Sequence, residues 1–441
     1  MNRITVPSFR SGLAKAALGI ALVTGSAAGM TLASASALAA GPSLKLTPAF
    51  QKIAAPLQQE INAAKTKPGV VAAKGNSAAL GAALAKEKAD LEAAFAAIGN
   101  QDDRLIAGQF AVTLGSIAED SAIQRRGVEA MIASGKAPAA DLPKLHFYAG
   151  QFAYLAKDYA GARTSLQAAI DGGYKENDVE ILLAESYLAD NQSAQGLTML
   201  QKAIDAKRAS GQPVPESWYK RGLLAAYRVK AGPQASVFAS GLVQANPSTQ
   251  NWGIAITIIR EIGGIPSQEM LDLLRLMGRT NSYNEARDYL EYVEAADPRR
   301  LPGEVLKVLD AGQASGKLPA TDRTAADARA MASGRVAADR ATLPALEKAG
   351  LAPGATAVTA IANGDALLSY GESAKAEALY NAALSKPGVD MPRALTRLGI
   401  AQADQGKYAA AQATFAKVSG PRKPIADLWS AYAASKAHGA S

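Results

Sequence analysis

The chain has 441 residues and no cysteine, which excludes disulfide bonds, thiolate metal sites and thiol nucleophiles. It has two histidines, His146 and His438, and neither belongs to a metal-ligand spacing, so we expect no metal and no cofactor. The formal net charge of +8 is spread over short basic clusters, whereas nucleic-acid-binding proteins usually concentrate basic residues on one face. We therefore expect no nucleic-acid partner.

Residues 1–40 are predicted to be a signal peptide. An apolar stretch follows a leader with three basic residues and no acidic one: Arg3, Arg10 and Lys15. Small residues at Ala37 and Ala39 form a cleavage pattern, with a second option after Ala40. The alternative is an uncleaved membrane anchor, but glycines and serines dilute its apolarity. We expect a mature chain in the periplasm or outside the cell, with no integral membrane span.

Residues 41–100 are predicted to form a helical hairpin that caps the N-terminal end. A first helix is expected over 44–65, and the run Gly75-Asn76-Ser77 supplies a break and a helix cap. The second helix has one apolar face with helical spacing: Leu80, Leu84, Leu91, Phe95 and Ile98.

Residues 101–248 are predicted to form helical repeats. The stretch from Pro143 to Glu176 aligns with the stretch beginning at Asn177, so that Leu166 matches Leu200. A third unit begins near Pro215 and places small and aromatic residues in the corresponding positions: Trp218, Gly222, Ala235 and Phe238. It ends at Asn246-Pro247, because a proline disfavours helix at the preceding residue.

Residues 249–356 depart from the repeat, and we expect irregular helical hairpins there, with a separate small domain as the alternative. Two repeats return over 357–424, where small and aromatic residues recur in one order: Gly364, Gly371, Ala376 and Tyr380, then Gly399, Gly406, Ala411 and Phe415. Residues 425–441 are predicted to be a capping helix and tail, with an apolar stripe around Trp429 that covers the open end.

This pattern resembles the tetratricopeptide repeat. The unit Pro392–Pro424 matches best, at Leu395, Leu398, Gly399, Gly406, Tyr408, Ala411, Phe415 and Val418. The resemblance implies an all-α, right-handed solenoid of antiparallel helix pairs, and with the leader it implies an exported bacterial protein. Fixed-period helical repeats of this kind usually present a binding surface.

In tetratricopeptide proteins, fixed positions of each first helix line a concave groove. Carried over to this sequence, the partner-binding residues are Lys144, Phe147, Gln151, Tyr154, Glu185, Tyr219, Leu223 and Tyr227. The family's best-known carboxylate clamp uses lysines and asparagines at two positions of each first helix, and those positions here hold other residues: Phe147, Ile181, Tyr219, Gln151, Glu185 and Leu223. We expect an aromatic and apolar groove for a helix or an extended segment of a partner protein. The alternative is that these residues are buried against neighbouring repeats.

The expected function is a non-enzymatic scaffold for protein–protein interaction in the bacterial cell envelope. Three alternatives stay open, each carried by its own residues. A glycan-binding protein would stack sugars on Trp218, Tyr219, Tyr227 and Trp252. An enzyme would need a polar site in the irregular middle, around Asp272, Arg275, Arg279 and Asp288. A homo-oligomer would form through the end helix around Trp429.

Overall fold

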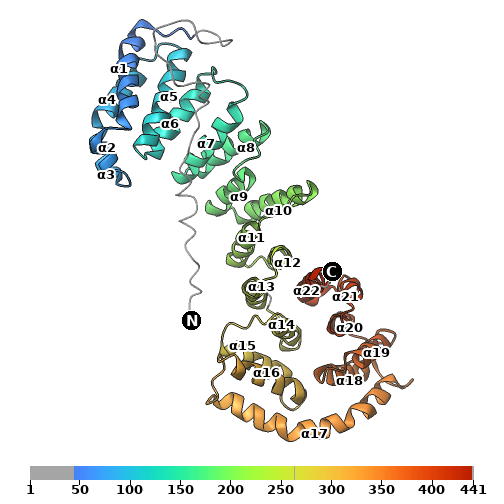
Figure 1. Ribbon diagram of the computed structural model, residues 1–441. Helices are drawn as coiled ribbons and strands as arrows, with labels where there is room; N and C mark the ends of the chain where they lie inside the picture. The colour runs from blue at the N-terminus through green and yellow to red at the C-terminus, as the bar shows by residue number, and fades with distance from the viewer. Residues whose placement is uncertain (1–43, 263, 440–441) are drawn as a thin grey trace. The chain divides into compact units, whose positions relative to one another are not determined.

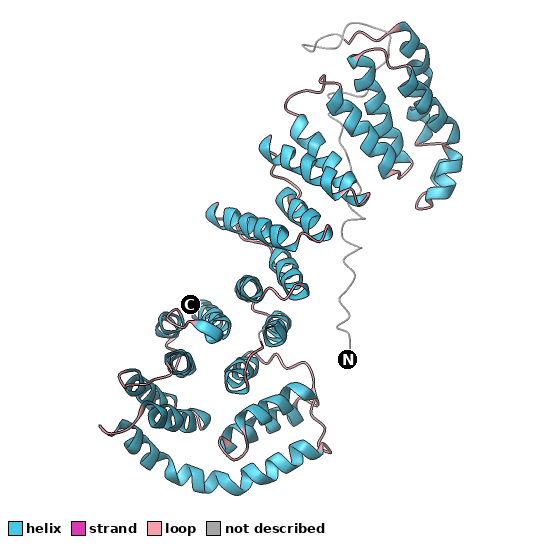
Figure 2. Cartoon of the chain, turned by 180° about the vertical axis from the view of Figure 1, so that it is seen from behind, coloured by secondary structure: helices cyan, strands magenta, loops and turns pink. Residues whose placement is uncertain are grey.

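The computed structural model describes residues 44–262 and 264–439, and every regular element in these residues is a helix (Figures 1 and 2). The all-α prediction is confirmed for this part of the chain, while the predicted signal peptide lies outside it. The chain divides into two compact units, Met1–Gln192 and Ser193–Ser441. Their boundary falls inside the stretch 101–248, and the stretch 249–356 belongs to the second unit instead of forming a unit of its own.

The first unit is a succession of helices. From α5 to α9, each helix packs against the helix that follows it in the chain. Its helices are α1 (Pro48–Ala64), α2 (Pro68–Ala72), α3 (Ser77–Ala83), α4 (Ala85–Ala96), α5 (Gln101–Ile117), α6 (Ser121–Ala133), α7 (Leu142–Leu155), α8 (Tyr159–Asp171) and α9 (Val179–Ala189).

In place of the second helix predicted for the N-terminal hairpin, the chain forms two helices, α3 and α4, and the short helix α2 precedes the break at Gly75. Asn76 caps α3 by accepting a hydrogen bond from the backbone N–H of Ala79, as its side chain allows. Helix α1 packs against both α4 and α5. Phe50 and Leu57 of α1 are buried there with Leu91 of α4, so the hairpin shares one apolar core with the first repeat-like pair.

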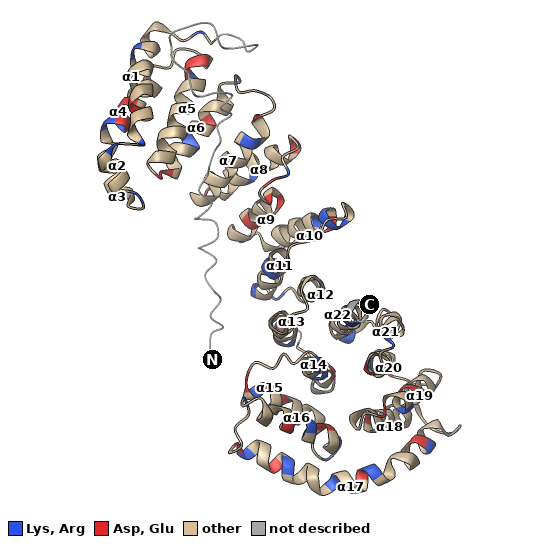
Figure 3. Cartoon of the chain, in the orientation of Figure 1, with Lys and Arg blue, Asp and Glu red and all other residues tan. Residues whose placement is uncertain are grey.

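The second unit contains the remaining helices of the described chain. They are α10 (Ser193–Ala209), α11 (Glu216–Arg228), α12 (Gly232–Ala245), α13 (Thr249–Ile262), α14 (Ser267–Arg279), α15 (Ala286–Ala296), α16 (Pro302–Ala314), α17 (Arg323–Leu351), α18 (Ala357–Ser369), α19 (Ser373–Leu384), α20 (Met391–Asp404), α21 (Tyr408–Phe415) and α22 (Lys423–Gly439), with a 3₁₀ turn, η2 (Gly420–Arg422), before the last helix. Successive helices pack together, and basic and acidic residues are interspersed along α17 (Figure 3).

Four helix pairs share one close contact, in which a glycine of the first helix lies against a large side chain of the second. The partner always follows the glycine by sixteen positions. A Cβ atom added to Gly399 would lie 2.4 Å from the ring of Phe415, so no larger residue fits there without displacement. The other pairs are Gly150 with Leu166, Gly222 with Phe238, and Gly364 with Tyr380, at 2.6, 2.5 and 2.7 Å. This contact lets the two helices of a pair approach closely.

The turns after the first helices also repeat. Gly371 and Gly406 have φ values of +85° and +76°, which is the left-handed region that glycine occupies at low cost. Lys157 takes the corresponding position between α7 and α8 with a φ of 62°. Gly406 thus follows the end of α20 in a left-handed turn.

The last helix does more than cover an open end, because α22 packs against α12, α13 and α14 as well as α21 (Figure 1). It therefore joins the last repeat of the second unit to helices near the beginning of that unit. Trp429 is 0% exposed in this contact. Trp429 is thus covered by its own chain and offers no surface to a second copy, while self-association through other residues of the end helix stays a prediction.

Candidate functional site

The eight predicted groove residues divide into buried and half-buried ones. Phe147, Tyr219 and Leu223 are 2%, 4% and 0% exposed, so they belong to the core and cannot contact a partner. Phe147 stacks on Tyr174 with ring centroids 4.8 Å apart. A Cβ on Gly241 would lie 2.3 Å from the ring of Tyr219, which shows how closely a helix covers that face. For these three residues the prediction of a groove is contradicted by their burial.

The other five predicted groove residues are half-buried: Lys144, Gln151, Tyr154, Glu185 and Tyr227. Tyr227 donates a hydrogen bond to Glu261, and the ring of Tyr154 meets the edge of Tyr159 at a centroid distance of 5.6 Å. Lys144, Gln151, Tyr154 and Glu185 lie in the first unit, and Tyr227 lies in the second. Neither unit by itself brings together the eight residues that the resemblance assigned to one groove.

Of the four residues named for an enzyme in the middle of the chain, Asp272 and Arg275 belong to a buried ionic network, whereas Asp288 pairs with Arg260 and Arg279 pairs with Asp404. Asp272 is 0% exposed and accepts contacts from three guanidinium groups. Its Oδ1 atom lies 3.1 Å from Nη1 of Arg275 and 3.4 Å from Nε of Arg397, and its Oδ2 atom lies 2.6 Å from Nη1 of Arg422. Burial alone would raise the pKa of Asp272, but the three arginines outweigh it and hold the pKa below its ordinary value.

Two further carboxylates complete the network. Arg275 binds Glu304 through Nε and Nη2, both at 2.7 Å, and the hydroxyl of Tyr292 donates to Glu304 at 2.6 Å. Burial would raise the pKa of Glu304, and Arg275 outweighs that effect so that the pKa is lowered. Asp365 accepts hydrogen bonds from Tyr380, Arg393 and Arg397. These charged groups are paired with one another, which indicates a structural role that ties α14, α16, α18, α20 and η2 together.

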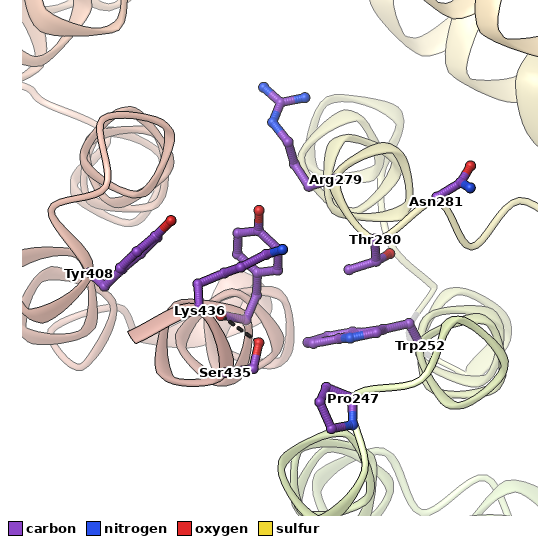
Figure 4. A pocket seen from close by; sticks show the side chains of 9 residues that line it. Pro247, Trp252, Arg279, Thr280, Asn281, Tyr408, Ser435 and Lys436 are labelled. Atoms are coloured by element: carbon purple, nitrogen blue, oxygen red, sulfur yellow. Dashed lines mark hydrogen bonds between the residues drawn. The ribbon is translucent and has the colours of Figure 1, made fainter. Parts of the chain in front are cut away.

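A cavity of about 510 Å³ lies where helix ends from the two sides of the second unit meet, and we call it the seam pocket. Its lining comes from α13, α14, α21, α22 and adjoining turns: Pro247, Trp252, Arg279, Thr280, Asn281, Tyr408, Tyr432, Ser435 and Lys436. Figure 4 shows Tyr408 and Lys436 on one side and Trp252 and Thr280 on the other. A volume of this size suits a small ligand or a short segment of a polymer.

Two basic side chains enter the lining, and no described lining residue is acidic. Arg279 ends α14 and donates Nε and Nη2 to the two carboxylate oxygens of Asp404, each at 2.8 Å. This fork fixes the guanidinium plane across two helices that are distant in sequence. Lys436 is exposed on α22, with its Nζ atom 5.6 Å from the ring centroid of Tyr432.

Aromatic rings form the apolar part of the seam pocket. Tyr432 meets the edges of Trp252 and Trp429 at centroid distances of 6.2 and 5.6 Å, and Trp429 stacks on Phe415 at 6.2 Å. Burial raises the pKa of Tyr432, and nearby Arg279 opposes this only in part. Its phenol is therefore neutral over the ordinary pH range and presents a hydroxyl group beside the two basic side chains.

Sequence reasoning identified single residues of the seam pocket without identifying the pocket. It singled out Trp252 as an aromatic platform, Tyr408 as a repeat signature and Arg279 as a polar residue of the middle. These residues meet only because α22 returns to α12, α13 and α14. A helical period reports which face of a helix is apolar, and it does not report which distant helix packs there.

Within the described residues, no group of histidine, aspartate and glutamate side chains is arranged to hold a metal ion. None of the described helices combines the length and the apolar character that a membrane crossing requires. No protein-family model matches the sequence, and no curated protein is similar to it at a significant level.

Proposed function

We propose that this chain is an exported scaffold of tetratricopeptide type, a right-handed solenoid of helix pairs, that binds a segment of a partner protein in the bacterial cell envelope. In this proposal the seam pocket is the binding site, and it replaces the groove first assigned from the repeat pattern. The observation that carries the proposal is the lining, in which aromatic rings and two basic side chains surround a cavity of about 510 Å³.

Rigidity of the walls supports binding. The Arg279–Asp404 fork and the buried network around Asp272 fix α14, which lines the pocket, to α20 and to the turn η2 that precedes α22. Little conformational freedom is then lost when a ligand enters, which favours affinity. Neighbouring helices of the second unit pack against the lining helices, as α12 does against α13 and α20 does against α21.

Catalysis is less well supported than binding. A catalyst needs a general base, a general acid or an activated nucleophile within reach of the substrate. The described lining offers an arginine, a lysine and tyrosines, and burial makes Tyr432 a weaker acid than an ordinary tyrosine. The carboxylates of Asp272 and Glu304 are buried in contact with arginines and lie outside the lining.

Glycan binding is the second candidate, and the platforms first assigned to it are mostly covered. Trp218, Tyr219 and Trp252 are 3%, 4% and 3% exposed, so their faces cannot stack on a sugar. Tyr408 and Tyr432 are half-buried and remain as aromatic surfaces in the seam pocket. The seam pocket is thus the binding site for either candidate, and the crosslinking experiment below separates them because it identifies a protein partner.

The proposal is tested by photocrosslinking in cells, with a photoreactive phenylalanine analogue in place of Tyr408. The matched control carries the same analogue at Val358, which is 72% exposed on α18 and outside the pocket lining. We expect one protein to be crosslinked from position 408 and absent from position 358. Mass spectrometry of the crosslinked peptide should place the partner in the envelope. Equal labelling from both positions, or no crosslink from 408, would contradict the proposal.

Export is tested separately by mass spectrometry of the N-terminus of the purified protein. A mature chain that begins after Ala39 or Ala40 is the expected result. A chain that retains the leader and stays with the membrane fraction would replace the signal peptide by the anchor alternative.

A further inference from the structure

We infer that the seam pocket takes an acidic segment of the partner protein, in which a carboxylate side chain is next to an aromatic or large apolar one. This inference rests on the proposed function and narrows it, because it names the chemistry that the partner must present. It differs from the groove first predicted, which was aromatic and apolar, both in position and in the charge of the ligand.

The charged groups of the pocket lining are both cationic. Arg279 uses Nε and Nη2 on Asp404, which leaves its Nη1 group for the cavity. Lys436 is exposed and adds an ammonium group. The hydroxyls of Thr280 and Ser435 already donate to backbone carbonyls of their own helices, at 2.9 and 2.8 Å. These two hydroxyls therefore offer a ligand only acceptor oxygens, whereas the two cations, with no acidic residue in the described lining, match an anionic ligand.

The apolar part of the lining favours a ligand that has a hydrophobic group beside its carboxylate. Pro247, Tyr408 and Tyr432 border the cavity, and the edge contacts among Trp252, Tyr432 and Trp429 hold this wall together. A neutral sugar could bond to the hydroxyl and amide groups of the lining, but it would bring no negative charge to the ammonium group of Lys436. An acidic peptide with an aromatic or apolar neighbour satisfies both parts of the site.

The charge of this chain argues against its own segments as the occupant. Residues 1–43, which lie outside the described part, carry Arg3, Arg10 and Lys15 and no acidic residue. A second copy of the chain has the same positive net charge, +8 for the full sequence, and removal of the three basic residues of the leader leaves it positive, so its approach is opposed by like charge. Charge complementarity therefore favours a different protein with an acidic surface segment.

The test is fluorescence anisotropy with the purified full chain and a labelled peptide of alternating glutamate and phenylalanine, amidated at its C-terminus. A peptide with glutamine in place of glutamate is the charge control, and an oligomer of galacturonic acid is the competing glycan. The pocket variant is Lys436→Glu. The matched control is Lys417→Glu, which makes the same charge change at an exposed lysine outside the lining.

We expect the acidic peptide to bind, and Lys436→Glu to weaken binding by about tenfold or more, because a charge-assisted contact becomes a repulsion. Lys417→Glu should change it by less than about threefold. Equal binding of the glutamine peptide, or equal effects of the two variants, would overturn the inference. So would preferential binding of the galacturonate oligomer that depends on Lys436, since the ligand would then be an acidic glycan.

The two proposals fail in different ways. If photocrosslinking from position 408 identifies a partner whose crosslinked segment has no acidic residue, the scaffold proposal stands and the acidic ligand is overturned. If no partner is crosslinked while the acidic peptide binds through Lys436, the ligand chemistry is supported and the cellular function is not.

Discussion

The indole N–H of Trp429 donates a 2.8 Å hydrogen bond to the backbone carbonyl of Asp272, which lies 157 positions earlier in the chain. The carboxylate of the same aspartate contacts the arginines of the buried network. Asp272 of α14 thus contacts the last helix through its backbone carbonyl and the buried arginines of the second unit through its carboxylate. Because a buried polar group left without a partner is costly, the return of α22 depends on these contacts as well as on apolar packing.

All three tryptophans lie in the second unit, at positions 218, 252 and 429. Tryptophan fluorescence during urea unfolding therefore reports on this unit without a contribution from the first. The stability predictions below use this measurement on the full chain, with circular dichroism as the check that the helices are retained under native conditions.

The first prediction compares two buried tryptophans. Trp429→Phe removes the hydrogen bond to Asp272 and part of the aromatic stack, and it should destabilise the second unit by about 1–3 kcal/mol. In the described structure the buried indole N–H of Trp218 has no hydrogen-bond partner. Trp218→Phe should therefore cost less, because it removes an unsatisfied donor together with the lost packing. A larger loss at Trp218 than at Trp429 would contradict the importance of the bond to Asp272.

The second prediction concerns the glycine contact of the helix pairs. A methyl group at Gly399 would meet the ring of Phe415, so Gly399→Ala should cost about 1–3 kcal/mol through overpacking. Gly334 in α17 is the matched control, since a Cβ there meets nothing within 4 Å. Gly334→Ala should stabilise by about 0.5–1 kcal/mol, because alanine is the better helix former. Equal changes in the free energy of unfolding at the two glycines would show that the helix at Gly399 does not pack tightly against Phe415 in solution.

Much of the repeat architecture could be predicted from the sequence, because it depends on local spacing. Gly364 and Gly399 are followed by an aromatic residue at the same distance, and the structure places each glycine against that ring. The left-handed turn at Gly406 follows from the same register. Such contacts lie within one helix pair, so a single period reports both partners.

The seam pocket and the buried network could not be predicted in this way. Arg397 contacts Asp272 and Arg279 contacts Asp404, and each pair is separated by 125 positions. Charged residues within amphipathic helices normally face solvent, so their burial is visible only once the helices of the second unit are assembled. The same reason explains Phe147 and Tyr219, which periodicity assigned to a groove although neighbouring helices cover them.

The third prediction tests the network through Arg397. This side chain is 2% exposed and contacts both Asp272 and Asp365, so Arg397→Met leaves two buried carboxylates with fewer partners. We expect a loss of about 3–5 kcal/mol in the free energy of unfolding of the second unit. Arg287, with 71% of its side chain exposed, pairs with Glu291 on a helix surface. Arg287→Met should change stability by less than about 1 kcal/mol, and a comparable loss at both positions would argue against a buried network.

The fourth prediction is an acid-dependent loss of stability in the second unit. The arginines lower the pKa values of Asp272 and Glu304 in the folded protein, whereas in the unfolded chain these pKa values return to about 4. Unfolding therefore takes up protons at low pH. The stabilisation from the two carboxylates is complete above about pH 5 and decreases as the pH falls through 4, by up to ~1.4 kcal/mol per pH unit for each group.

Urea midpoints at pH 7, 5, 4 and 3 measure this slope. Glu304→Gln should lower stability at pH 7 and make the acid slope shallower, because one of the two titrating groups is gone. An unchanged slope in that variant would mean that other carboxylates of the second unit govern its acid unfolding.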